Sequence, residues 1–493
     1  MSYPESIEDV WIRGRDSGAM EFEGRWFPWR GFSNAARQLE AILNSARIDS
    51  SCAIGLIARN RPGPVIAFAA LLAKKRCVLM IYAAQSPAGI AADIRKLQLA
   101  AVIGDPSDWT AEAKAAVREA GSIGISVDSD PEDPVSIVDG LAIPGRGPFR
   151  TSGESVTMEL LTSGTTGAPK RVPISVTTFE SSVADATAIY AGNQAQPQAG
   201  IVFHPLSNIA GVTFLIPMMF RGQPICLLEK FTLAGWLSAV KRHRPTRGSL
   251  PPAILRTILD EKVPREALAS FSAIGVGAAT LDPVLQQRFE AEYHIPLLIS
   301  YGATEFCGVI ANWTLDVYQK MGHLKRGSVG LARPGVALRV VRPGDARELP
   351  RGEIGVLEAQ VARVGEGWIR TTDLASIDEE GFLYLHGRAD GAINRGGFKV
   401  LPETIASALR EHPDVVDATA VGIVDTRLGE VPVAAVQLGV GAVVDEAALM
   451  RFARERLLSY QVPVAIKALS ELPRNASMKV DLTAVKRLFE RPT

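Results

Sequence analysis

Short apolar runs alternate with helical patterns near the start of the chain. Cys52–Ala58, Cys77–Tyr82 and Ala101–Gly104 are typical of strands, Pro64–Lys74 of an amphipathic helix and Pro87–Leu99 of a second helix. Strands this apolar suit a parallel sheet that is covered on both faces and connected by right-handed crossovers. The same kind of run returns at Ile201–Pro205, Pro224–Leu228, Ala273–Val276 and Pro296–Ile299. We therefore expect two sheet-containing subdomains within about the first 330 residues.

The pattern changes in the second half of the chain. From Gly327 to Leu385, short segments broken by Gly and Pro indicate an antiparallel β unit. The last hundred residues or so predict a small α+β domain with a final strand, loop and helix, preceded by helices at Pro402–Glu411 and Glu446–Leu458 and strands at Ala418–Val424 and Val433–Leu438. The predicted fold is α/β, with a large multi-layer N-terminal domain of parallel-rich sheets and a β unit (1–387), a linker (388–390) and a small α+β C-terminal domain (391–493).

Composition narrows the function classes. A chain of 493 residues exceeds what one core usually organises, in agreement with two domains. The 53 basic and 53 acidic residues balance, which argues against a dedicated nucleic-acid binder. The four cysteines are far apart, so neither a zinc cluster nor a disulfide framework is expected, and the six histidines are scattered and indicate no metal site.

No targeting segment is visible in the sequence. The longest apolar runs, Pro64–Ala73 and Gly211–Phe220, are shorter than the about 20 residues that cross a bilayer. The N-terminus has no apolar segment after a basic start, as a signal peptide would. We expect a soluble, cytoplasmic protein with no membrane span.

The strongest local signal is a run of small hydroxyl and glycine residues that ends in Pro-Lys. It consists of Thr162, Ser163, Gly164, Thr165, Thr166, Gly167, Ala168, Pro169 and Lys170. Such residues suit a loop whose N–H and O–H groups converge on phosphate oxygens, with Lys170 supplying charge. The spacing is not that of a Walker loop. A flexible linker would have no need for the Pro-Lys ending, so we favour phosphate binding.

Six segments, in the expected order, together resemble the motifs of the adenylate-forming superfamily of acyl- and aryl-CoA synthetases, peptide-synthetase adenylation domains and luciferases. They are the phosphate loop Thr162–Lys170, the second signature Tyr301–Glu305, the following stretch Gly327–Gly335, the ribose-binding element Trp368–Leu374, the hinge with its loop Gly387–Val400, and the lysine segment Pro473–Lys479. The resemblance covers essentially the whole chain from Cys52 onward. It implies a mobile C-terminal domain with ATP bound between the two domains.

The resemblance also implies a role for each motif residue. Thr304 contacts the α-phosphate, Asp373 accepts hydrogen bonds from the ribose hydroxyls and Arg388 approaches the ribose or phosphate. The implied ATP-binding set is Thr162, Ser163, Gly164, Thr165, Thr166, Gly167, Lys170, Gly277, Ala278, Tyr301, Gly302, Asp373 and Arg388.

Glu305 is the expected Mg²⁺ ligand. It follows the apolar run Pro296–Ile299, so it is expected near the carboxyl end of a strand, where α/β proteins bind ligands. Carboxylate oxygen is a ligand that Mg²⁺ prefers, and Mg²⁺ bridges nucleotide phosphates.

The C-terminal motifs imply a two-step reaction. By resemblance, Lys479 reaches the carboxylate and α-phosphate while the acyl-adenylate forms, acting with Thr304 and Glu305. The C-terminal domain then turns about Asp390, and Gly396 and Gly397 let the backbone approach the pantetheine arm of coenzyme A.

The acyl pocket is expected to be apolar. Its predicted residues are Asn208, Ile209, Val212, Gly308 and Val309. Asn208 stands where the family has an aromatic residue or His, and the resemblance implies that this position borders the acyl carboxylate. Two further departures are Met478 and Thr372, each at a position where the family has Gly. The pocket favours a fatty, alicyclic or aromatic acid.

The predicted function is ATP-dependent conversion of a hydrophobic carboxylic acid to an acyl-adenylate, followed by transfer to CoA. The expected cofactors are ATP, Mg²⁺ and coenzyme A. Alternatives are a stand-alone adenylation enzyme that loads a carrier protein, a ligase that mainly uses preformed acyl-AMP, and a catalytically degenerate nucleotide or acyl-CoA binder. Expected partners are the small-molecule acid and either CoA or a carrier protein. A homodimer is a further possibility, and no nucleic acid is expected as a partner.

Overall fold

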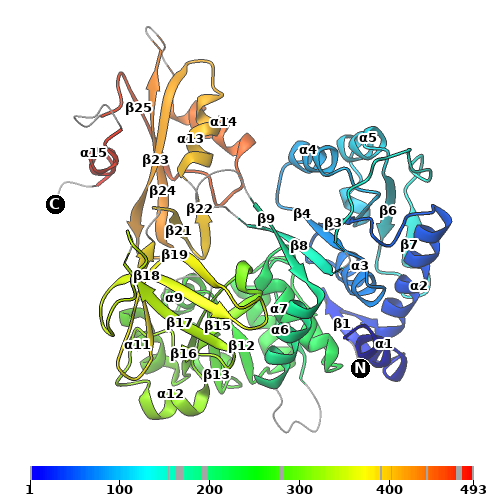
Figure 1. Ribbon diagram of the computed structural model, residues 1–493, viewed down its shortest axis with the longest axis horizontal. Coiled ribbons are helices and arrows are strands. Elements are labelled where there is room, and N and C mark those ends of the chain that lie inside the picture. Colours follow the sequence, from blue (N-terminus) through cyan, green and yellow to red (C-terminus); the bar gives the residue numbers. More distant parts are fainter. Residues whose placement is uncertain are drawn as a thin grey trace.

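Five β-sheets and the helices around them build the described part of the protein (Figure 1). The computed structural model describes residues 3–153, 155–162, 170–189, 198–277, 281, 283–342, 344–388, 391–400, 402–439, 442, 444–473 and 480–490. Its α-helices are α1 (Tyr3–Arg13), α2 (Trp29–Ser45), α3 (Pro62–Ala73), α4 (Pro87–Leu97), α5 (Ala111–Glu119), α6 (Val176–Ile189), α7 (Ile209–Phe220), α8 (Leu233–His243), α9 (Pro252–Asp260), α10 (Arg265–Leu268), α11 (Pro283–Tyr293), α12 (Leu315–Met321), α13 (Pro402–Arg410), α14 (Glu446–Arg456) and α15 (Leu482–Arg487).

A seven-stranded sheet organises the first part of the chain. Its order is β7 (Val135–Ile137), β6 (Ile123–Val127), β5 (Ala101–Gly104), β3 (Ile54–Ala58), β4 (Val78–Tyr82), β8 (Val156–Thr162) and β9 (Lys170–Ser175). The strands from β6 to β8 pair in parallel, and the two edge strands are antiparallel. Every residue of β3 and β5 is buried, as expected for a parallel sheet with both faces covered.

Helix α3 corrects one prediction from the sequence. The segment was expected to be amphipathic, but α3 has no polar residue and is buried on all sides. It packs on the seven-stranded sheet, and α1 and α2 cover its other side. A helix between two layers needs no polar face. Pro62 begins it, where a missing N–H costs nothing.

A four-stranded sheet joins the N-terminus to the middle of the chain. Its order is β10 (Gly200–Val202), β11 (Ile225–Leu227), β1 (Gly18–Phe22) and β2 (Arg25–Pro28). Strands β1 and β11 are parallel, with Glu21 opposite Cys226.

Two further sheets complete the N-terminal part. One has the order β12 (Arg247–Ser249), β13 (Ala273–Val276), β14 (Leu297–Ala303), β15 (Gly308–Asn312) and β16 (Leu331–Ala332). The described residues among the first 332 therefore form three sheets, whereas the sequence predicted two sheet-containing subdomains. The other sheet is the predicted antiparallel unit, formed by β17 (Val336–Val341), β18 (Gly355–Val361), β19 (Trp368–Ile377) and β20 (Leu383–Arg388).

The C-terminal residues form a separate α+β unit, orange to red in Figure 1. Its sheet contains β22 (Phe398–Val400), β21 (Ile393–Arg395), β24 (Gly429–Leu438), β23 (Val415–Asp425) and β25 (Ala465–Leu469). Helices α13 and α14 pack on this sheet around a core of their own. The predicted α/β fold class, with a large N-terminal part and a small C-terminal one, is confirmed.

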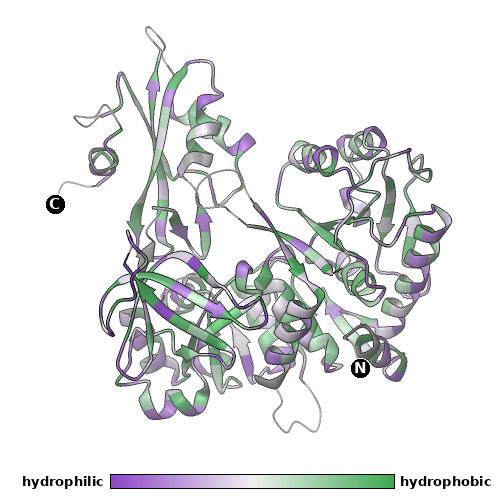
Figure 2. Cartoon of the chain, viewed as in Figure 1, coloured by the Kyte–Doolittle hydropathy of each residue, from purple (hydrophilic) through white to green (hydrophobic). Residues whose placement is uncertain are grey.

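The apolar residues lie where this architecture needs them. Figure 2 shows hydrophobic residues concentrated along the sheet strands, with hydrophilic residues on the outer turns. All four cysteines are free and buried. Among the described residues, no helix combines the length and apolar character that crossing a bilayer requires.

The close packing of α3 leads to a stability prediction for Gly63. A Cβ atom at Gly63 would lie 1.8 Å from the Val127 carbonyl oxygen at the end of β6. Gly63→Ala must therefore push the helix off the sheet, and overpacking of this kind costs about 1–3 kcal/mol. We expect a lower midpoint of urea unfolding. Gly367→Ala, where a Cβ meets nothing within 4 Å, is the control. Equal midpoints for both variants would contradict this packing.

Candidate active site

The candidate site begins at the carboxyl end of β14. This strand is parallel to β13 through Ile299 and antiparallel to β15 from Ser300 onward. Gly277 directly follows β13, and a Cβ there would lie 3.1 Å from the Ser300 hydroxyl oxygen, so the backbone lies tightly against the next strand. Tyr301 and Gly302 are the next residues of β14. The structure thus brings Gly277, Tyr301 and Gly302 to the sheet edge where α/β proteins bind ligands.

A hydrogen bond links Tyr301 to Asp373. The Tyr301 hydroxyl donates to Asp373 Oδ2 at 2.6 Å, and the tyrosine is buried. Burial raises the pKa of Tyr301 well above its usual value, and the Asp373 carboxylate raises it further. Asp373 lies on β19, and its backbone partner on β20 is Arg388. Two predicted ATP-binding residues, 72 positions apart, therefore meet directly.

A short turn after β14 carries the expected phosphate and metal groups. Residues Thr304–Phe306 form a single 3₁₀ turn, in which Thr304 is half-buried, Glu305 is exposed and Phe306 is buried. Glu305 lies as predicted, just beyond the strand end. Its exposed carboxylate is a hard oxygen donor of the kind Mg²⁺ prefers, so the donor chemistry fits this ion.

Gly308, one of the predicted acyl-pocket residues, lies where three elements of the fold meet. Its φ of +121° favours glycine, and a Cβ there would contact the Ser182 hydroxyl at 3.3 Å and Thr213 Cγ2 at 3.4 Å. Ser182 of α6 in turn donates a hydrogen bond to the Cys307 carbonyl at 2.5 Å. Helix α6, helix α7 and the start of β15 therefore converge on this glycine.

Arg363 is a positioning residue that the sequence analysis missed. Its guanidinium donates to the carbonyls of Phe306 and Val309, each at 3.0 Å, and pairs with Asp185 at 3.1 Å. Burial lowers the pKa of Arg363, and the Asp185 carboxylate opposes that shift. Arg363 thus fixes the backbone on both sides of Gly308. No motif marked it, because its partners lie far away in the sequence.

The other predicted pocket residues lie at the start of α7. Asn208 is the residue before the helix, and its side chain makes no capping hydrogen bond. Asn208 and Ile209 are half-buried, whereas Val212 is fully buried. Helix α7 contacts β15, which contains Gly308 and the half-buried Val309. The five predicted pocket residues therefore lie on two elements in contact.

The ends of the predicted phosphate loop are adjacent. Thr162 ends β8, Lys170 begins β9, and the two are backbone partners in the antiparallel pair. The other loop residues and three further predicted residues lie outside the described part of the chain: Ser163, Gly164, Thr165, Thr166, Gly167, Ala278, Asp390 and Lys479.

A hairpin of the C-terminal unit approaches Asp373. Gly396 and Gly397 form the two-residue turn between β21 and β22, with φ of +55° and +91°, which a type I′ turn requires. Lys399 on β22 places its Nζ 3.9 Å from Asp373 Oδ1. Lys399 was not predicted to be a site residue, although it belongs to the motif around the two glycines.

Aromatic contacts support this hairpin. Phe398 stacks on Tyr460 with ring centroids 4.3 Å apart, and Arg395 donates to the carbonyls of Tyr460 and Val462. Burial raises the pKa of Tyr460, and Tyr82 at the end of β4 raises it further. The C-terminal unit therefore faces both Asp373 and the end of the seven-stranded sheet.

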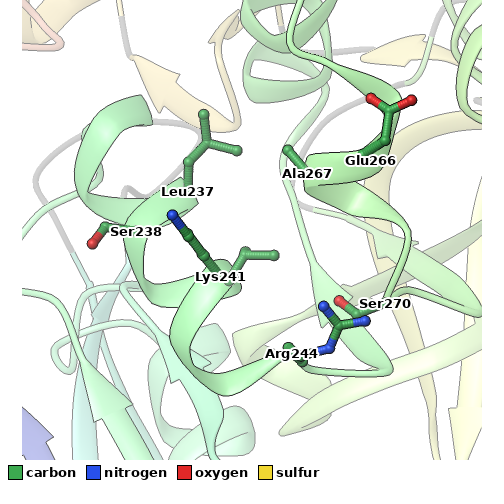
Figure 3. Close-up of a pocket in the computed structure, with 8 residues that line it drawn as sticks. Leu237, Ser238, Lys241, Arg244, Glu266, Ala267 and Ser270 are labelled. Atoms are coloured by element: carbon green, nitrogen blue, oxygen red, sulfur yellow. The ribbon is translucent and has the colours of Figure 1, made fainter.

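A separate cavity of about 350 Å³ lies between α8 and α10 (Figure 3). Leu237, Ser238 and Lys241 line it from α8, and Glu266 and Ala267 line it from α10. It shares no residue with the candidate active site. Lys241 and Arg244 lie at the carboxyl end of α8, where cations complement the helix dipole. This position accounts for the positive charges in the cavity lining.

Several named relatives match the chain over part of their length. A probable CoA ligase (CCL9) of Humulus lupulus is 30% identical over 68% of this chain and 66% of that protein. The 2-succinylbenzoate–CoA ligase of Bacillus velezensis is 32% identical over 65% of this chain and 66% of that protein. The indoleacetate–CoA ligase of Aromatoleum aromaticum is 30% identical over 67% of this chain and 67% of that protein. The matched segments thus span about two thirds of each relative.

Solved structures match the whole fold. The amide bond synthetase McbA from Marinactinospora thermotolerans aligns over 99% of this chain and 100% of its own, with a TM-score of 0.84 and 24% identity. A double mutant of o-succinylbenzoate CoA synthetase (MenE) from Bacillus subtilis, bound with its product analogue OSB-NCoA, has a TM-score of 0.80 with 22% identity and 98% of each chain covered. MenE in complex with the acyl-adenylate intermediate OSB-AMP has a TM-score of 0.65, with 22% identity over 99% of this chain and 98% of its own.

Family models match both parts of the chain. The model described as AMP-binding enzyme matches residues 8–367, and the model described as AMP-binding enzyme C-terminal domain matches residues 404–479. The first match alone covers more than half of the chain. As its motifs predicted, this chain belongs to the AMP-binding enzymes of the adenylate-forming superfamily.

Proposed function

We propose that the protein is an AMP-forming acid–thiol ligase, which activates a hydrophobic carboxylic acid with ATP and transfers the acyl group to coenzyme A. The observation that carries this proposal is the position of Asp373, which faces Tyr301 of the large domain and Lys399 of the small one. A nucleotide site at such a boundary suits a reaction in two steps. Relatives named as CoA ligases support thiol transfer.

In the first step, the acid carboxylate attacks the α-phosphorus of ATP, and pyrophosphate leaves. Thr304 lies at the strand end from which its hydroxyl can donate to the α-phosphate, and Lys170 and the loop before it bind the outer phosphates. Glu305 would hold Mg²⁺, which when bound supplies positive charge to the phosphates. Lys479 neutralises the charge that develops at phosphorus.

In the second step, the CoA thiol attacks the acyl carbonyl, and AMP leaves. We infer that the small domain (391–493) turns against the large one (1–387) about the hinge 388–390, centred on Asp390. The hairpin with Gly396 and Gly397 then borders the pantetheine path. Two observations support this arrangement: Lys399 lies near Asp373, and the chain superposes better on MenE bound with OSB-NCoA than on MenE with OSB-AMP.

The substrate in this proposal is a hydrophobic monocarboxylic acid. The predicted pocket residues, Asn208, Ile209, Val212, Gly308 and Val309, include no charged side chain. Arg363 lies close by, but Asp185 and two carbonyls engage its guanidinium, so it is not free to bind a second carboxylate. Fatty, alicyclic and aromatic acids fit these surroundings. Indoleacetate, which one relative's name gives, is an acid of the aromatic class.

One experiment separates the proposed function from its alternatives. ATP–pyrophosphate exchange with a panel of acids tests for adenylation, and its absence would leave a nucleotide binder or a ligase that needs preformed acyl-AMP. The acyl-AMP is then offered to CoA, to a phosphopantetheinyl carrier protein and to an amine, because one solved neighbour is named an amide bond synthetase. Preferred transfer to CoA is the expected result. Preferred transfer to either of the others would overturn the CoA assignment.

The contact between Tyr301 and Asp373 predicts nucleotide choice. Asp373 retains lone pairs that can accept ribose hydroxyls beside the bond from Tyr301. Loss of such charge-assisted bonds costs about 1.5–3 kcal/mol, or roughly 10–150-fold in affinity. ATP should therefore bind more tightly than 2′,3′-dideoxy-ATP, and Asp373→Ala should remove that difference in competition binding. Asp345→Ala, at an exposed loop, is the control. Equal binding of both nucleotides to the native protein would exclude Asp373 from the site.

Two substitutions should separate the half-reactions. Lys479→Ala should slow adenylate formation by about 10²–10³-fold, which is typical of losing one preorganised charge, and should leave transfer from supplied acyl-AMP nearly unchanged. Gly397→Leu should have the opposite effect, because its side chain obstructs the pantetheine path. Gly397→Ala is the control for backbone strain, because it places a side chain at the same φ of +91° without the bulk of leucine. Lys320→Ala, an exposed lysine of α12, is the control for lost surface charge.

The outcomes of these variants are distinct. Equal loss of both steps in folded Lys479→Ala would contradict the two-conformation mechanism. Little change in either step would indicate that the protein works mainly from preformed acyl-AMP, which is the outcome that Met478 beside the lysine would produce.

Asn208 should govern acid size. A His ring at the start of α7 would fill space that the smaller amide leaves open beside the acyl carboxylate. Asn208→His should therefore lower kcat/KM for branched or aromatic acids more than for short linear ones. An unchanged acid profile would mean that Asn208 does not border the pocket.

A further inference from the structure

Three potential metal ligands meet in the N-terminal domain and share no residue with the candidate active site. They are Glu21 on β1, Cys226 on β11 and His243 at the end of α8, and their ligand atoms all lie within 4.8 Å of one another. We propose that these three side chains form a binding site for a zinc-class divalent transition metal. The ion would link the N-terminal strand to the middle of the chain.

Strand register and helix position bring the ligands together. Glu21 and Cys226 are direct partners in the parallel pair of β1 and β11, so both side chains lie on the same face of the sheet. Helix α8 packs against this sheet, and its last residue is His243. The Trp26 ring of β2 meets the His243 ring edge-on, with centroids 5.9 Å apart, and limits its rotation.

The donor set selects the kind of metal. One sulfur, one imidazole nitrogen and one carboxylate oxygen are ligands that Zn²⁺ takes, whereas Mg²⁺ and Ca²⁺ prefer oxygen alone. Glu21 and Cys226 are almost fully buried, and the His243 side chain is 12% exposed. That exposure leaves a route for the ion and a fourth position for water, as in sites with three protein ligands.

Arg242 supplies an outer partner that orients the carboxylate. Its guanidinium donates to Glu21 Oε1 at 2.8 Å, while His243 Nε2 contacts the other oxygen, Oε2. One carboxylate oxygen is thus held by a second residue and the other faces the remaining ligands, which is how ligating carboxylates are usually supported. The Arg242 side chain is 44% exposed, so water screens much of its charge.

A metal-free reading of the same contacts is an ion-pair network of Glu21, Arg242 and His243. That network uses both carboxylate oxygens, and the Cys226 thiol lies beside its members Glu21 and Arg242. A reactive thiol is a poor explanation for Cys226, because the thiol has almost no exposure to solvent. The two readings differ in whether sulfur binds the ion, and spectroscopy can detect that bond.

The test uses the full chain, freed of metal by a chelator and titrated with Co²⁺. Cobalt replaces zinc in such sites, and a sulfur–cobalt bond gives a charge-transfer absorption in the near ultraviolet. We expect this absorption to saturate at one Co²⁺ per chain and to disappear when Zn²⁺ is added. Mg²⁺ at Glu305 gives no such signal, so failure of the proposed ligase function would leave this readout unchanged.

Matched variants show which residues produce the sulfur–cobalt absorption. C226S should abolish the absorption, whereas C52S, at another buried free cysteine, should retain it. H243Q, at the exposed edge of the cluster, should weaken Co²⁺ affinity by at least the 10–100-fold that loss of a supporting partner costs. Zn²⁺ should raise the melting temperature of the native chain and have little effect on H243Q.

Two results would overturn the proposal. One is the lack of a sulfur–cobalt absorption in the native chain, which would leave only the ion-pair network. The other is an absorption that persists in C226S, which would place the ion elsewhere. Circular dichroism spectra matching the native chain show that C226S and H243Q are folded.

Discussion

The hydrogen bond between the Tyr301 hydroxyl and the Asp373 carboxylate holds the candidate active site together. A buried phenol needs an acceptor, and a nearly buried carboxylate needs donors, so each satisfies the other. The bond ties the carboxyl end of β14 to β19 and therefore joins two sheets. Because Asp373 also faces Lys399, the small domain approaches the large one at the same carboxylate. Three parts of the fold thus meet at one polar contact.

The backbone after Tyr301 follows from steric limits. A Cβ at Gly302 would lie 2.3 Å from the Gly308 carbonyl, so the two ends of the turn touch through backbone atoms. Cys307 adopts a left-handed conformation, which few non-glycine residues do, and Arg363 holds the carbonyls on either side. The backbone from Gly302 to Val309 is therefore held closely by its own contacts and by Arg363.

Local patterns predicted local structure well. The strand at Ala273–Val276 was predicted with its observed bounds, and the helix from Pro402 ends one residue earlier than expected. Glu305 lies at the strand end where the apolar run before it placed it. These features depend on neighbours in the chain, and periodicity together with Gly and Pro positions describes such neighbours. Fully buried α3 was taken for amphipathic because its surroundings come from distant layers.

Features that depend on distant residues escaped the sequence analysis. The third sheet of the N-terminal part exists because β1 pairs with β11, and no local pattern carries that register. Arg363 and Lys399 have partners in other elements, so their roles emerge only in three dimensions. The same holds for Glu21, Cys226 and His243, which looked scattered in the sequence. Motif similarity identified the family, and the roles of Lys479, Asp390 and the phosphate loop stay predictions because these residues lie outside the described part of the chain.

The pairing of β1 with β11 has a consequence for synthesis on the ribosome. The first strand has no parallel partner until residues 225–227 have been made. At typical elongation rates of about 5–20 residues per second, this wait lasts on the order of 10–40 s. During that time one edge of the β1–β2 hairpin stays unpaired, and unpaired strand edges favour aggregation. The nascent N-terminus is therefore the segment for which we expect chaperone protection to matter most.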